Sequence, residues 1–356
     1  MRRELGMLVA FLVMGFSIWL SNSAFLNHDN ILNYSRQVGM LGIMAVGITF
    51  VIVTGGIDLS LGSVMGLTGV IIAKFYDMGQ PIWLGIIVAV TVALVVGAIQ
   101  GTIITRLDLQ PFIVTLGFML LLRGVSQTIA HGGSLSLGDA PFRNLQNGPF
   151  SNDNPILPWA LLIFLAVGVL AAFVLHFTVF GRYLYAIGGN RAAAEYSGIP
   201  VKKLETITYM IAAGFSALAG ICYAAYIGQM NHGVGVAYEL FAIAAAVLGG
   251  VSLRGGEGTI FGVVIGTSIW ALIRNGFDVA QIVIRNASGR IVRRLTLDEN
   301  WYYIVMGAVI LVAIILDQIV HLMQERRRTR SAGQAPPQAL STDSNAPAKT
   351  EAEVRV

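Results

Sequence analysis

Long apolar segments run through most of this chain and decide what it can fold into. A helix needs about 20 mostly apolar residues to cross the roughly 30 Å hydrocarbon core of a bilayer. Only 12% of the 356 residues are charged, which is about half the share of a soluble domain. We therefore expect an all-α polytopic membrane protein whose transmembrane domain covers residues 1–325. About ten spans are predicted, at residues 6–22, 37–53, 59–75, 82–105, 111–130, 157–178, 205–229, 238–253, 257–276 and 301–321.

Lysine and arginine near the span ends predict the orientation, because cytoplasmic loops are enriched in them. With the N-terminus inside, Arg106, Arg254, the basic loop 179–204 and the C-terminus all fall in the cytoplasm. Loop 277–300 carries four arginines and yet falls outside. Apolar residues alternate on both sides of residues 286–289, which predicts a β-hairpin there, although a miscounted span is the alternative. A signal peptide is the alternative for the first segment.

The composition changes after residue 325. Residues 331–356 are rich in Ala, Pro, Ser, Thr and Glu. Such a segment buries too little apolar surface to offset the entropy lost on ordering. We predict that residues 326–356 form a disordered cytoplasmic tail.

Two apolar segments end in similar glycine-containing turns. Residues 55–59 and 249–253 both read Gly-Gly, a β-branched residue, a polar residue and Leu. The free backbone groups at such breaks are tolerated in a membrane only where protein buries them or they line water. The turns are therefore expected to line a path. The alternative is that Asp58 and Ser60 only cap a helix and that the glycines only allow close helix packing.

Arg123 is a charge inside the apolar segment 111–130. A charge at the centre of a membrane helix costs about 2.5–3.5 kcal/mol on insertion scales. Arg123 should therefore face the interior of the bundle or extend toward the interface. Gating, substrate contact and an ion pair with Asp58 are the roles considered.

The segment 188–200 predicts a helix of about two turns outside the membrane. Asn190 is a good N-cap, three alanines follow, Gly198 suits the position after the helix, and Pro200 stops it. A helix this short is unstable alone in water. It must dock on its own bundle or on another protein.

The catalytic and nucleotide-binding motifs of common enzymes do not occur in this sequence. No G-x-x-x-x-G-K-[ST] loop is present, so the chain cannot bind ATP in that way, and HExxH, GxSxG and clustered His and Cys are absent too. We expect no catalytic residue, no metal site and no cofactor in this chain. The net charge of +4 comes largely from residues that flank apolar segments, which favours membrane lipid over nucleic acid as the partner.

Four ordered strings resemble permeases of the ribose-type branch of ABC importers, in the branched-chain amino acid/ribose permease superfamily. They are residues 55–63, 111–117, 188–199 and 238–250, and the similarity covers roughly residues 35–275 and the last span. The resemblance implies a dimeric pore in the bacterial inner membrane. It also implies a cytosolic ATPase subunit that carries ATP and Mg, and a periplasmic or lipid-anchored sugar-binding protein.

The resemblance also assigns roles to residues. It implies that the 188–199 loop couples to the ATPase, through Gly188, Gly189, Asn190, Arg191, Ala194, Glu195, Ser197 and Gly198. The expected translocation path contains Asp58, Ser60, Phe112, Thr115, Arg123, Gly249 and Gly250. The family's usual solutes are monosaccharides such as ribose, xylose or galactose. The alternatives are a nucleoside or autoinducer-2 permease, and an ion-coupled secondary transporter, which needs titratable groups near the midplane.

Overall fold

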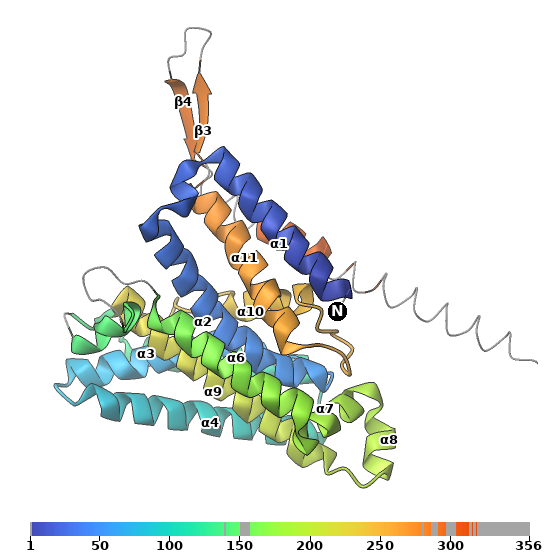
Figure 1. Ribbon diagram of the computed structural model, residues 1–356. Helices are drawn as coiled ribbons and strands as arrows, with labels where there is room; N and C mark the ends of the chain where they lie inside the picture. Colours follow the sequence, from blue (N-terminus) through green and yellow to red (C-terminus); the bar gives the residue numbers. More distant parts are fainter. Residues whose placement is uncertain are drawn as a thin grey trace, which may run out of the picture. The chain divides into compact units, whose positions relative to one another are not determined.

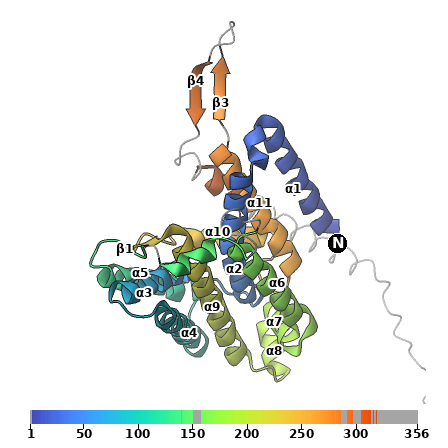
Figure 2. The ribbon, with the colours of Figure 1, turned by 60° about the vertical axis from the view of Figure 1, so that its left-hand side comes forward.

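The computed structural model describes residues 2–138, 140–149, 157–279, 281–285, 291–296 and 304–312, and residues 315 and 318. The predicted tail 326–356 lies outside these residues. The elements below belong to the unit Met1–Ile314. Figure 1 labels most of them, and Figure 2 also labels α5 and β1. The long helices are α1 (Arg2–Ser21), α2 (His28–Val53), α3 (Leu61–Asp77), α4 (Ile82–Leu107), α5 (Pro111–Ile129), α6 (Trp159–Phe177), α9 (Val201–Ile227) and α11 (Ile260–Val279). The shorter elements are η1 (Ser23–Leu26), η2 (Pro141–Gln146), α7 (Val179–Gly189), α8 (Arg191–Tyr196), α10 (Tyr238–Leu248), β1 (Leu135–Ser136), β2 (Gln229–Met230), β3 (Gln281–Arg285) and β4 (Ile291–Thr296).

The polytopic all-α fold predicted from the sequence is confirmed. Among the described residues, seven helices are long and apolar enough to cross a membrane, namely α1, α2, α4, α5, α6, α9 and α11. α3 has 17 residues. α10 has only 11 residues, so at 1.5 Å per residue it spans about 16 Å, half of a bilayer core. The helix predicted at 238–253 is therefore shorter than expected. In the last predicted span, at 301–321, residues 304–312 are helical.

α2 forms the centre of the unit. Its residues from Val38 to Val53 are buried throughout, as expected for a helix that is apolar on all sides. In both views α2 lies beside α6 and α9 (Figures 1 and 2). Glycines make these contacts close: a Cβ atom at Gly39 would overlap the backbone of Ala160 in α6, and one at Gly47 would overlap Phe215 in α9.

The predicted hairpin is present. β3 and β4 pair antiparallel, with Ile282 opposite Leu295 and Ile284 opposite Arg293. The turn at 286–290 lies outside the described residues. The alternation of apolar residues that predicted this hairpin is the ordinary period of a strand.

Candidate functional site

The segment between α9 and α10 returns along the glycine face of α3. Gly62, Gly66 and Gly69 share this face because they are three and four residues apart. A Cβ atom at Gly69 would overlap Met230, one at Gly66 would overlap Val234, and one at Gly62 would overlap Gly235. Residues 230–235 therefore run antiparallel to α3, and α10 starts near the first turn of α3. The predicted spans 205–229 and 238–253 leave this segment as a loop between them.

The N-termini of α3 and α10 consequently meet. The depth of this point follows from α4, because Asp58, just before α3, bonds Gln100. Gln100 lies seven residues before the end of α4 at Leu107, which is about 10 Å along the helix axis. Discontinuous helices that begin inside the membrane are typical of transporter solute sites, where unwound backbone is enclosed by protein.

Asp58 is the centre of a buried hydrogen-bond network at this point. Its Oδ1 accepts from the Ser60 amide at 2.8 Å and lies 2.6 Å from the Ser60 hydroxyl. Its Oδ2 accepts from Gln100 Nε2 at 2.6 Å. All three side chains are fully buried. Asp58 thus holds the turn that precedes α3 against α4. This role goes beyond the helix capping that was considered from the sequence.

Arg123 forms its ion pair with Glu239 and not with Asp58. Arg123 Nη2 lies 3.7 Å from Glu239 Oε1, and their side chains are 22% and 6% exposed. The ion pair considered from the sequence is present, but its partner is not Asp58: Gln100 and Ser60 occupy the Asp58 oxygens, and α10 brings a nearer carboxylate to α5. Glu239 is in the first turn of α10.

Three glycine turns meet at the opposite end of α10. The Gly256 amide donates to the Val53 carbonyl at 2.8 Å, so the turns after α2 and after α10 are joined. Gly188, at the end of α7, packs on the same atoms, and a Cβ atom there would overlap Val53 O and Gly256 N. We call this contact of Val53, Gly188 and Gly256 the glycine junction. It connects both predicted breaks to the segment that leads into α8.

α8 has the local structure that the sequence predicts. The Asn190 side chain accepts from the Ala193 amide at 3.0 Å, and Gly198 has a φ of +80° directly after the helix. Ala194 is buried against the bundle, whereas Glu195, Ser197 and Gly198 are exposed. The Tyr196 side chain is exposed almost completely, at 93%. Figure 1 shows α8 beyond the end of α7, beside the start of α9.

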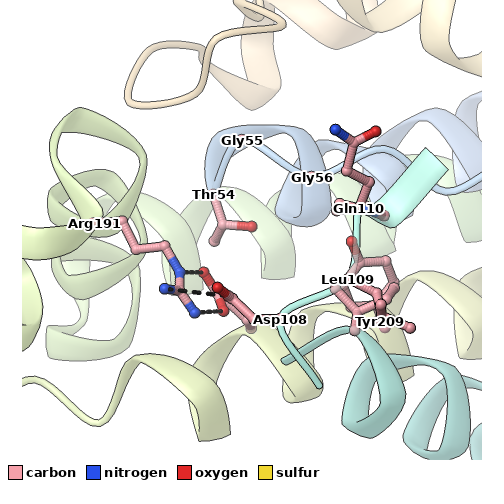
Figure 3. A pocket seen from close by; sticks show the side chains of 11 residues that line it. Thr54, Gly55, Gly56, Asp108, Leu109, Gln110, Arg191 and Tyr209 are labelled. Atoms are coloured by element: carbon pink, nitrogen blue, oxygen red, sulfur yellow. Dashed lines mark hydrogen bonds and ion pairs between the residues drawn. The ribbon is translucent and has the colours of Figure 1, made fainter. Parts of the chain in front are cut away.

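Arg191 connects α8 to α9 at the edge of a cavity. Arg191 Nε donates to Glu205 Oε1 at 2.9 Å and Nη2 donates to Oε2 at 3.3 Å. Arg191 Nη1 lies 3.8 Å from Asp108 Oδ1. The hydrogen bond to Glu205 raises the pKa of the Arg191 guanidinium. Figure 3 shows Arg191 reaching toward Asp108 at the edge of a cavity of about 280 Å³, which Thr54, Gly55, Gln110 and Tyr209 also line.

The remaining predicted path residues lie in different surroundings. Thr115 is buried, donates to the Pro111 carbonyl at 2.9 Å and lies 3.5 Å from the Ile57 carbonyl, beside the turn that holds Asp58. Phe112 is 51% exposed on α5. Gly249 packs on α11, since a Cβ atom there would overlap the Gly262 carbonyl. Gly250 follows α10 with a φ of +89°, and Gly189 ends α7 at the surface.

Sequence reasoning missed the partners that come from distant segments. They are Gln100, Asp108, Glu205, Gly235 and Glu239, and the exposed Tyr196. Gln100 and Glu239 carried one available signal, because each is a polar side chain inside an apolar segment and such residues are expensive in a membrane.

Comparison with known proteins agrees with this architecture. Residues 30–314 match the family described as "Branched-chain amino acid transport system / permease component". The chain is 36% identical to the ribose import permease protein RbsC of Haemophilus influenzae over 314 residues, which cover 87% of this chain and 91% of the relative. The identity to RbsC of Escherichia coli K12 is also 36%, over 87% of this chain and 92% of that relative.

A third relative carries a different sugar in its name. The fructose import permease protein FruG of Bifidobacterium longum is 36% identical over 285 residues, which cover 78% of this chain and 79% of the relative. No solved structure matches this chain. The family match covers most of the chain. The chain is a multi-pass membrane protein that belongs to the permease component family of the branched-chain amino acid transport systems.

Proposed function

We propose that this chain is the membrane-spanning permease subunit of an ABC importer for a monosaccharide, driven by a separate ATPase subunit. The observation that carries the proposal is the 36% identity with ribose import permeases over nearly the whole length of both chains. The meeting of the α3 and α10 N-termini supports it, because it provides the kind of enclosed, polar break at which transporters hold a solute.

In the proposed mechanism the permease performs no chemistry. A periplasmic or lipid-anchored binding protein delivers the sugar to one side, and a cytosolic ATPase docks against α8 on the other. Tyr196 and Glu195 are exposed there, and an exposed tyrosine is a common anchor of protein interfaces. Movement of α8 reaches α9 through Arg191 and reaches the turns after α2 and α10 through the glycine junction. α8 and both termini then lie in the cytoplasm, with 326–356 as a disordered tail.

A second permease chain completes the proposed pore. Among the residues that the structure describes, the outer face of α5 is uncovered: Ile113, Leu120 and Leu121 are 64%, 63% and 56% exposed. Lipid or an identical chain would cover this apolar face. Phe112 lies at the start of the same helix, and Arg123 lies where the exposed face meets the interior.

The test is uptake by the purified complex in lipid vesicles. The chain would be co-expressed with the ATPase and the receptor encoded beside it, and vesicles would be offered ribose, xylose, galactose and fructose with ATP inside. We expect one of these sugars to accumulate and to stimulate ATP hydrolysis. Uptake that persists without ATP but collapses with the proton gradient would instead identify an ion-coupled transporter. Stimulation by a nucleoside alone would reject the sugar.

Gly198→Pro is expected to weaken the coupling between ATPase and permease by about tenfold without preventing membrane insertion. Proline fixes φ near −65° and lacks an amide hydrogen, whereas Gly198 has a φ of +80° and donates to the Glu195 carbonyl at 3.0 Å. The measurement is sugar-stimulated ATP hydrolysis together with co-purification of the ATPase. Tyr196→Ala is the complementary variant, because it removes the exposed ring and keeps the helix end. Full stimulation in both variants would argue against docking at α8.

A further inference from the structure

A cluster of buried polar atoms lies where the N-termini of α3 and α10 meet α5. Glu239 Oε1 pairs with Arg123 of α5. The other carboxylate oxygen, Oε2, lies against Gly62 of α3, where a Cβ atom would overlap it. Within the described part of the chain, Oε2 is buried and has no hydrogen-bond partner, and the same holds for Arg123 Nε. An ion pair in the membrane normally satisfies more of its atoms than this one does.

Ser63 adds a third polar group to this region. It follows Gly62 in the first turn of α3, its side chain is 2% exposed, and its hydroxyl has no partner among the residues described. Serine in a helix commonly bonds the carbonyl four residues before it, as Ser126 of α5 does with Leu122. The carbonyl four residues before Ser63 belongs to Leu59, which precedes α3, so Ser63 does not form this bond. Three polar atoms without a partner among the described residues are therefore found on α3, α5 and α10, the three helices that meet here.

The chemistry of these groups indicates what could satisfy them. A carboxylate oxygen accepts hydrogen bonds, a guanidinium N–H donates them, and a serine hydroxyl does both. Arg123 and Glu239 carry opposite charges, so the pair itself adds no net charge that would select an ion. A neutral compound with several adjacent hydroxyl groups matches this set, because each hydroxyl both donates and accepts. The site is approached from α5, since Arg123 is 22% exposed and Glu239 only 6%.

We infer that Glu239, Arg123 and Ser63 form a contact site for the hydroxyl groups of a neutral sugar on its way through the permease. The inference rests on the proposed function and specifies where the solute is held. Gly62 belongs to the site because a side chain there would overlap Glu239 Oε2. The Asp58 network is adjacent in sequence but already satisfied by Gln100 and Ser60, so it supports the turn and does not bind the solute.

The test compares a sugar with analogues that each lack one hydroxyl group. Vesicles with the complete complex would import ribose, or the sugar that the uptake panel selects, and each of its monodeoxy analogues. The ratio of kcat/KM for the parent sugar to that for an analogue reports one hydroxyl contact. Since the same receptor delivers the sugar to every permease variant, its own selectivity cancels when variants are compared.

Glu239→Gln and Ser63→Ala are the test variants, and Thr267→Val is the matched control. Thr267 is another fully buried hydroxyl without a partner among the described residues, and it lies on α11 next to Gly266, which packs on the far end of α10. For at least one analogue we expect the wild-type ratio to fall by about tenfold in Glu239→Gln and by about threefold in Ser63→Ala, as for a lost hydrogen bond. Thr267→Val should leave every ratio unchanged.

The experiment distinguishes failure of the contact site from failure of the proposed function. If the wild type imports the sugar and both variants keep all ratios within twofold, the contact site is wrong and the transport function stands. If the wild type imports none of the sugars, the proposed function fails and this inference fails with it. Ser63→Ala keeps the test decisive if Glu239→Gln does not assemble, because removing one hydroxyl leaves the ion pair intact. A loss of uptake with unchanged ratios would indicate a structural role only.

Discussion

Asp58→Ala is expected to lower the free energy of unfolding by about 3–5 kcal/mol and to reduce uptake more than tenfold. The substitution leaves the Gln100 amide and the Ser60 amide without their acceptor, while the Ser60 hydroxyl keeps Gln100 Oε1 at 3.0 Å. Each buried polar group that loses its partner costs about 1–3 kcal/mol. Because Asp58 fixes the turn before α3, the start of α3 should also lose its position. Thermal unfolding in detergent measures the first effect, and vesicle uptake measures the second.

The double variant Asp58→Leu with Gln100→Leu separates stability from transport. Replacing both partners of a buried polar pair by apolar groups is often close to neutral, whereas removing one partner is not. The double variant should therefore recover the part of the Asp58→Leu loss that comes from the unpaired Gln100 amide, while the Ser60 amide and hydroxyl are left without an acceptor. If uptake recovers equally, Asp58 only supports the turn. If the single Asp58→Ala variant unfolds like the wild type, the network described here does not stabilise the fold.

Much of the architecture was predictable because the signals are local. A spanning helix can be predicted from its own apolar residues, and most of the long helices lie where the apolar segments of the sequence predicted spans. The same holds for α8, whose cap at Asn190 and stop at Gly198 depend on neighbours within four residues. The hairpin β3–β4 also follows from local alternation.

The contacts within the candidate site were not predictable, because they join residues far apart in the sequence. Arg123 had an obvious need for a carboxylate, but the choice between Asp58 and Glu239 depends on where α10 starts. That start depends on residues 230–235, whose glycine and polar residues resemble an ordinary loop. Only their contact with Gly62, Gly66 and Gly69 shows that the segment enters the bundle. The spacing of the glycines predicted close helix packing, but it did not indicate which segment packs against them.

Arg191→Glu is expected to reduce sugar-stimulated ATP hydrolysis and uptake by about tenfold. The substitution places a third carboxylate beside Glu205 and Asp108. Two like charges 4 Å apart near a protein surface repel by about 4 kcal/mol at an effective dielectric constant of 20. Solvent and salt reduce this figure, since the Arg191 side chain is 38% exposed. The repulsion should detach α8 from α9, which is the route by which the ATPase would move the bundle.

The exchanged pair Arg191→Glu with Glu205→Arg provides the decisive comparison. It restores opposite charges at the contact, so it should recover at least half of the lost coupling, whereas Glu205→Arg alone should be as defective as Arg191→Glu. Asp108→Asn is the matched control and should have little effect, because Asp108 is 83% exposed and its oxygen is 3.8 Å from Arg191. Raised salt should soften the defect of Arg191→Glu. If the exchanged pair stays inactive while the complex assembles, Arg191 acts on the ATPase directly and not through α9.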